Sequence, residues 1–280
     1  MRWRGERESD NVEDGRGMSG GGKFAIGGIG AIIIVVIGLL TGKDFSGLLN
    51  NVQSTSIEQP ANNTKPKEDD STVQMVRVIL ASTEDVWSSI FKDNGAQYTA
   101  PRLRLFTNST QSGCGGASAS MGPFYCPADQ KVYIDLSFCD ELRDRFQAPG
   151  NFAVAYVVAH EVGHHIQNLL GISEQVQRQR SRLSEADYNK LSVKLELQAD
   201  FLAGVWAYHA NKTRHILEAG DLESALTAAN AIGDDKLQKE AQGYIVPDAF
   251  THGTSQQRMY WFKKGFETGD MNQGRFQDIR

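Results

Sequence analysis

The sequence lacks a strong excess of charge of either sign. Its 29 lysines and arginines nearly balance 34 aspartates and glutamates, which gives a formal net charge of −5 over 280 residues. Nucleic-acid-binding domains usually carry a basic patch and a high isoelectric point, so this balance argues against nucleic acid as a partner. The length allows one or two domains.

Cysteine is also scarce. The three cysteines, Cys114, Cys126 and Cys139, include no C-x-x-C pair, so a zinc knuckle fits them poorly. Cys114 and Cys126 flank a loop rich in small residues, GGASASMGPFY, whose length closes easily into a disulfide. An exported domain would meet the oxidising compartment that such a bond requires. We therefore predict a Cys114–Cys126 disulfide, with Cys139 a free, buried thiol near the start of a helix.

Long apolar runs are absent apart from one, FAIGGIGAIIIVVIGLLTG, which extends from Phe24 to Gly42. As a helix, these nineteen uncharged residues would measure about 28 Å, close to the ~30 Å hydrocarbon core of a bilayer. A cleaved signal peptide is the alternative. However, the run is longer than the apolar part of such a peptide, and no A-x-A site follows it. We expect a single transmembrane helix at residues 24–42.

Lysines and arginines are distributed unevenly around this run. Five precede it, and only Lys43 follows it before Lys65. The positive-inside rule then predicts a single-pass inner-membrane protein with a cytoplasmic N-terminus and an exported remainder. Residues 1–23 are polar and glycine-rich and are expected to be disordered. Residues 43–70 are expected to form a polar linker and residues 71–280 one folded domain.

Apolar periodicity and turn residues give a coarse map of this domain. Helices are predicted at residues 71–91 (with Ser71 as the cap), 140–146, 151–168, 184–210, 222–231 and 259–266. Strands are predicted at residues 101–106 and 130–138. Helices dominate, and a small sheet precedes the helix at residues 151–168, so the predicted fold class is α+β.

The helix at residues 151–168 is apolar, yet it carries His160, Glu161, His164 and His165. Burying such groups costs several kcal/mol unless something compensates them. His160 and His164 are four residues apart and share one helix face, where two imidazoles can bind one zinc ion. In H-E-x-x-H sites the glutamate, here Glu161, is the general base. The alternative is that these histidines lie in the protein core and that other protein groups satisfy their hydrogen bonds. His165 points away from the shared face and is expected to be a surface residue or to support a ligand.

A catalytic zinc site needs a third protein ligand and an open position. The extended motif H-E-x-x-H-x-x-G-x-x-H fails here, because Gln167 and Leu170 stand at its glycine and third histidine. On the helix at residues 184–210, Glu196 and Asp200 share a face among leucines and alanines. We predict Glu196 as the third ligand and Asp200 as the partner of a ligand histidine. A solvated carboxylate pair is the alternative, and His209 and His215 are weaker ligand candidates.

Several segments together resemble a known bacterial family. HEVGHHIQ, ELQAD, CGGASASMGPFYCPADQKVYID and THGTSQQR, within residues 70–270, are similar to segments of the membrane-anchored neutral zinc metallopeptidases. Gly163 in the first segment would also let another backbone approach closely. The resemblance implies a zincin-like fold, one zinc ion bound by His160, His164 and Glu196, Glu161 as the base, and a peptidase activity. It names no substrate.

The expected reaction is zinc-dependent hydrolysis of a peptide or protein substrate, by an enzyme attached to the bilayer through residues 24–42. His252, backed by Tyr244 and Arg258, is the candidate that stabilises the oxyanion. Residues 131–135 form either a sheet edge that binds substrate or a plain core strand. The alternative function is a catalytically inactive zinc-binding envelope domain that binds a protein partner.

Overall fold

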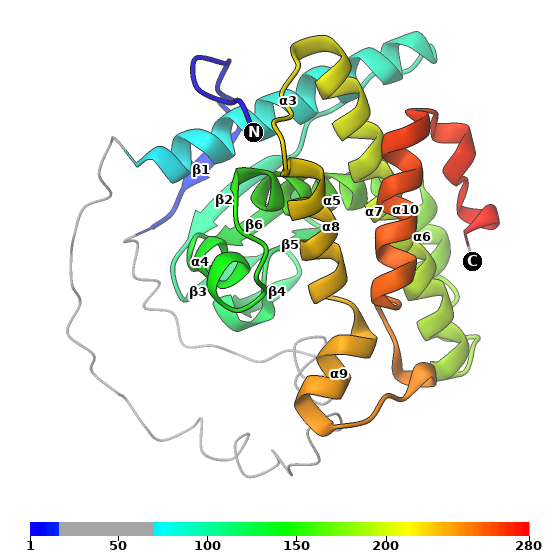
Figure 1. Ribbon diagram of the computed structural model, residues 1–280. Helices are drawn as coiled ribbons and strands as arrows, with labels where there is room; N and C mark the ends of the chain where they lie inside the picture. Colours follow the sequence, from blue (N-terminus) through cyan, green and yellow to red (C-terminus); the bar gives the residue numbers. More distant parts are fainter. Residues whose placement is uncertain (17–69, 280) are drawn as a thin grey trace.

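The computed structural model describes residues 1–16 and 70–279, and Figure 1 shows how their elements are arranged. The predicted transmembrane helix at residues 24–42 lies outside this range, as does the predicted linker up to residue 69. Within residues 1–16 and 70–279, no helix is long and apolar enough to cross a membrane. The described chain is mainly helical with a small sheet, which confirms the α+β class.

A four-stranded sheet has the strand order β1-β2-β6-β5. Its strands are β1 (Val12–Asp14), β2 (Arg102–Phe106), β6 (Lys131–Asp135) and β5 (Phe124–Cys126). The β1–β2 and β2–β6 pairs are parallel, whereas β5 is antiparallel to β6. The two predicted strands are thus present as β2 and β6, although β6 ends earlier than predicted. Because β2 and β5 flank it on both sides, β6 is a core strand, and the sheet-edge interpretation is wrong.

A hairpin of β3 (Ser109–Ser112) and β4 (Gly115–Ser118) extends from the sheet. The predicted disulfide is present: Cys114, in the turn of this hairpin, is bonded to Cys126 at the end of β5, with 5.8 Å between their Cα atoms. It ties the hairpin to the sheet. Cys139 is a free, half-buried thiol, and burial raises its pKa to about 12.

The six predicted helices are present with shifted ends, and the sequence did not predict two further ones, at Ile172–Gln177 and Asp234–Gln242. The helices of the described residues are α3 (Ser71–Asp93), α4 (Ser137–Asp144), α5 (Asn151–Leu169), α6 (Ile172–Gln177), α7 (Glu185–Arg214), α8 (Asp221–Ala231), α9 (Asp234–Gln242) and α10 (Ser255–Thr268). Short 3-10 turns lie at Ala119–Met121, Pro247–Ala249, Met271–Gly274 and Phe276–Asp278. The cap of α3 is Asp70, whose carboxylate accepts the Thr72 N–H, rather than Ser71 as predicted.

Helix α5 lies at the centre of the domain and contacts α3, α7, α8 and the sheet (Figure 1). Every residue from Phe152 to Gly163 is buried, and Phe152 stacks on Trp206 of α7. A helix that is apolar on all sides is stable only when other elements cover it completely. The polar residues in this part of α5 are therefore held in place by the packing around them.

Helices α7 and α10 cross at very short range. A Cβ atom on Gly204 would lie 2.1 Å from the Phe262 carbonyl oxygen, and one on Gly265 would lie 2.0 Å from the Phe201 carbonyl oxygen. Neither position has room for a side chain. The two glycines thus let α10 approach α7 closely enough for Arg258, on α10, to reach Asp200, on α7.

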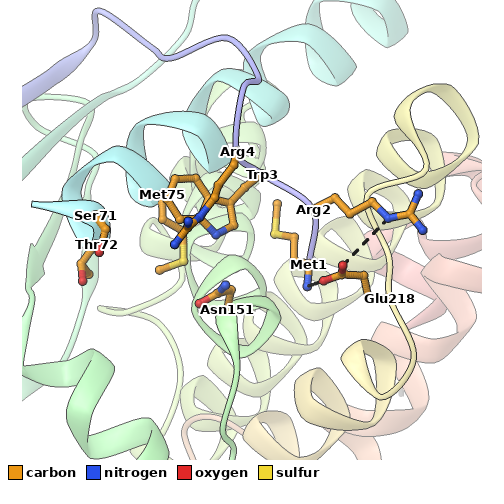
Figure 2. Close-up of a pocket in the computed structure, with 9 residues that line it drawn as sticks. All are labelled: Met1, Arg2, Trp3, Arg4, Ser71, Thr72, Met75, Asn151 and Glu218. Atoms are coloured by element: carbon orange, nitrogen blue, oxygen red, sulfur yellow. Dashed lines mark hydrogen bonds and ion pairs between the residues drawn. The ribbon is translucent and has the colours of Figure 1, made fainter.

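The prediction that residues 1–23 are disordered is wrong for residues 1–16, which pack on the domain (Figure 1). Val12 is buried in the core, and the amino group of Met1 lies 2.7 Å from Glu218 and 2.8 Å from Asp221. Figure 2 shows the first four residues beside a cavity of about 570 Å³ at the starts of α3 and α5. The polar composition misled the prediction, because these charged groups find partners on the domain.

Candidate metal centre

The site is built where α5 and α7 cross. A Cβ atom on Gly163 would lie only 2.9 Å from the Ala199 carbonyl oxygen, so glycine permits this close contact, as the sequence indicated. His160 and His164 share one face of α5, with their ring centroids 4.8 Å apart. The crossing sets Glu196 of α7 opposite both rings.

The potential ligand atoms converge. His160 Nε2 lies 3.2 Å from Glu196 Oε2, and His164 Nε2 lies 3.4 Å from Glu196 Oε1. Ligands bound tetrahedrally to zinc at about 2.0–2.1 Å are separated by roughly 3.3–3.4 Å, which the two histidine–glutamate spacings match, and the three ligand atoms all lie within 4.8 Å of one another. Among the described residues, these three form the one group of histidine, cysteine and acidic side chains able to hold an ion. His209 instead bonds to the Gly269 carbonyl, and His215 caps α7.

The second nitrogen of each imidazole has an oxygen partner. His160 Nδ1 lies 2.8 Å from Asp200 Oδ1, and His164 Nδ1 lies 2.9 Å from Gln167 Oε1. In a neutral ring, Nδ1 then carries the hydrogen and Nε2 keeps its lone pair for a metal. Both rings are therefore oriented as ligands.

Gln167 contacts a candidate ligand, although its sequence position did not mark it as a site residue. It appeared only as the residue that breaks the extended motif. In the structure it is fully buried, and its amide donates to the Leu195 carbonyl at 2.7 Å, which aims its oxygen at His164. Its partner belongs to the backbone of α7, and no local sequence pattern reveals such a contact.

Asp200 is fully buried at the centre of a polar network. It accepts hydrogen bonds from Tyr156 Oη at 2.5 Å and from Arg258 Nε at 2.8 Å, in addition to His160. Burial raises the pKa of Asp200, but Arg258 and His160 outweigh it and hold the pKa below its ordinary value. Arg258 was expected behind His252. It is instead the buried partner of Asp200.

The electrostatic setting favours positive charge. Burial lowers the pKa of His160, but Asp200 and Glu196 outweigh this effect and raise it to about 10. Burial raises the pKa of Glu196, yet His164 and His252 hold it well below its ordinary range. The fully buried Asp200 and the partly buried Glu196, beside two imidazoles, thus attract a cation, the role that a divalent metal fills.

Glu161 is buried on α5 directly after His160, with 7% of its surface exposed. None of the hydrogen bonds among residues 1–16 and 70–279 involves its side chain, unlike Glu196 and Asp200. A carboxylate that serves no structural hydrogen bond can accept a proton from water.

His252 lies in the loop before α10. The backbone N–H groups of Thr251, His252 and Gly253 all donate to Asp234 Oδ2, at 2.7, 2.6 and 3.0 Å. His252 Nδ1 lies 3.1 Å from Asp234 Oδ1, and its ring is about half exposed. Asp234, which the sequence analysis did not single out, therefore fixes this loop and its histidine. Tyr244, expected behind His252, is 62% exposed, and no hydrogen bond between described residues joins its side chain to His252.

His165 points toward the sheet and away from the metal ligands. It is fully buried, not at the surface, and burial lowers its pKa, so the ring is neutral. Its Nε2 donates to the Thr99 carbonyl at 2.7 Å, which leaves Nδ1 to accept from Tyr125 Oη at 2.9 Å. His165 thus anchors α5 to β5.

Comparison with known proteins decides the family. The profile described as "Putative neutral zinc metallopeptidase" matches residues 1–276. The chain belongs to this family. It is 49% identical to the protein YpfJ of Escherichia coli K12 over 279 residues, 96% of each chain. It is 41% identical to Rv2575 of Mycobacterium tuberculosis H37Rv over 201 residues, 68% of this chain and 66% of the relative. No solved structure matches the chain.

Membership of a zinc metallopeptidase family agrees with the resemblance noted in the sequence and with a zinc ion as the cofactor. The donor set fits that metal, since two imidazoles and one carboxylate are typical ligands of catalytic zinc.

The orientation of His164 by Gln167 is testable. Gln167→Leu removes the acceptor for the Nδ1 hydrogen while keeping a side chain of similar size. We expect zinc affinity to fall by about 10–100-fold, as for other partners of metal-bound histidines. Competition with a zinc chelator measures this affinity. Gln175→Leu, at an exposed position on α6, is the matched control, and equal affinities in both variants would contradict the assignment.

Proposed function

We propose that this protein is a zinc-dependent endopeptidase whose general base is Glu161. The observation that carries the proposal is the convergence of His160, His164 and Glu196 beside a buried carboxylate that has no structural partner. Three protein ligands leave a fourth position open, as catalytic zinc sites do.

The residues have separate roles in the proposed reaction. His160, His164 and Glu196 hold one zinc ion per chain. When bound, zinc polarises the substrate carbonyl and lowers the pKa of a water molecule toward about 7. Glu161 takes the proton from the attacking water and passes it to the leaving amine. Asp200 keeps the His160 ring in its ligand orientation.

His252 is proposed to stabilise the oxyanion that forms during hydrolysis. Three features support this role: the ring is partly exposed, it acts electrostatically on Glu196, and Asp234 holds its Nδ1. With Nδ1 bound to Asp234, Nε2 is the nitrogen left to donate to substrate.

The proposed substrate is an extended peptide that lies along β5. This strand ends the sheet on the side away from β1, and Tyr125 of β5 contacts His165 and Asn168 of the active helix. An edge strand offers unpaired N–H and C=O groups to a peptide of any sequence. Attachment to a bilayer through residues 24–42 is part of the proposal and rests on their uncharged, apolar sequence.

The roles of the two glutamates can be separated by substitution. Glu161→Gln keeps the shape of the side chain and removes proton transfer. It should retain zinc and thermal stability but lose ~10²-fold or more in the rate of hydrolysis. Glu196→Ala removes a ligand, so zinc content and melting temperature should both fall. The measurements are zinc content by mass spectrometry, thermal unfolding and cleavage of an unfolded protein such as casein.

Two outcomes would reject these roles. If Glu196→Ala binds zinc normally while Glu161→Gln loses it, the third ligand lies elsewhere. If the zinc-loaded parent protein cleaves no unfolded substrate, the result favours the alternative function given above, an inactive zinc-binding domain that binds a protein partner.

A second substitution tests His252. His252→Asn should lower kcat by about 10²–10³-fold, because an oxyanion donor acts mainly in the transition state. KM and zinc content should stay close to the parent values. His215→Asn, at an exposed position at the end of α7, is the matched control and should leave kcat unchanged. A His252→Asn variant with the parent kcat would exclude the role.

A further inference from the structure

Residues 1–16, here called the arm, form an integral part of the sheet. β1 pairs with β2 in parallel register from Val12↔Leu103 to Asp14↔Leu105. The Leu103 N–H donates to the Asn11 carbonyl at 2.9 Å, and the Gly15 N–H donates to the Leu105 carbonyl at 2.9 Å. Val12 is only 7% exposed. The arm therefore occupies an edge of β2 by strand addition.

Helix α3 supplies a buried carboxylate for the arm. Glu84 accepts from Ser9 Oγ at 2.5 Å, from Asn11 Nδ2 at 2.8 Å and from Arg7 Nη2 at 2.9 Å. Ser9 is fully buried and Glu84 is 9% exposed. Among the described residues, all side chains that hydrogen-bond to Glu84 belong to the arm. Because a buried carboxylate without partners is costly, the domain is built to receive this segment.

The charges of the arm are matched elsewhere as well. Glu13 pairs with Arg102 of the neighbouring strand β2 at 3.1 Å and with Lys131 of β6, one strand further along the sheet, at 2.9 Å. Arg7 also pairs with Asp85 at 2.8 Å. The arm lies along α3 in Figure 1, and its first residues reach Glu218 in Figure 2. A fit that extends over the whole arm is specific, not a chance contact.

The two ends that border residues 17–69 meet. Arg16 Nη1 lies 2.6 Å from Asp70 Oδ2, and the same guanidinium pairs with Asp14. Arg16 and Asp70, the described residues on either side of this interval, therefore lie side by side. The apolar run of residues 24–42 falls within this interval.

These contacts are incompatible with the topology expected from the lysine and arginine distribution. A single crossing at residues 24–42 would put ~30 Å of hydrocarbon between the arm and the domain. Nineteen residues suffice for one crossing and not for two. We propose that the arm and the domain lie on the same side of the membrane, with the arm completing the sheet at β2. Residues 24–42 then do not separate them.

Cysteine labelling of the full-length protein tests this proposal independently of any peptidase activity. In a Cys139→Ser background, Glu8→Cys marks the arm and Glu240→Cys marks the domain, both at exposed positions. A membrane-impermeant maleimide is applied to intact spheroplasts and again after permeabilisation. We expect both cysteines to be labelled under the same condition, whichever it is. Labelling of one in intact spheroplasts and of the other only after permeabilisation would overturn the proposal.

The binding site for the arm has its own readout. Glu84→Gln weakens three hydrogen bonds to the arm, so trypsin should cut after Arg7 and Arg16 about tenfold faster or more. Cleavage within residues 71–279 should not change, which would show that the domain stays folded. Glu240→Gln, an exposed position, is the control. Equal rates of arm cleavage in both variants would show that Glu84 does not hold the arm.

Discussion

The close crossing of α5 and α7 is the constraint on which the site depends. At Gly163 the two backbones approach so closely that even a Cβ atom would meet the Ala199 carbonyl. This contact brings Glu196 to both imidazoles and Asp200 to the far side of His160. A larger residue at Gly163 would separate the helices and move the carboxylates out of reach of the rings.

Charge balance explains why the surrounding residues take part. The fully buried Asp200 and the partly buried Glu196 both need positive partners, and Arg258 supplies one to Asp200. The approach of α10 at Gly204 and Gly265 makes that partner available. Glu196 contacts both imidazoles, and a metal ion bound by all three residues would be its counter-charge. The same three helices, α5, α7 and α10, thus provide both the packing and the metal-binding residues.

The sequence predicted the contacts that depend on the spacing of residues within one helix or one loop. His160 and His164 four residues apart, Glu196 and Asp200 on an apolar face, and the Cys114–Cys126 loop all predicted contacts that the structure contains. It did not predict contacts between distant segments. Gln167 is held by a backbone carbonyl of α7, β6 is interior because of strand order, and residues 1–16 pack on the domain through contacts such as those with Glu84 and β2.

The proposed activity depends on zinc bound by His160, His164 and Glu196, with one coordination position left open for water or substrate. X-ray absorption at the zinc edge of the purified full-length protein tests this binding most directly. We expect a shell of nitrogen and oxygen atoms at about 2.0–2.1 Å from the zinc ion, with the scattering pattern of two imidazoles and no sulfur. A sulfur atom at about 2.3 Å, or a shell without imidazole, would place the metal elsewhere and contradict zinc binding by these three residues.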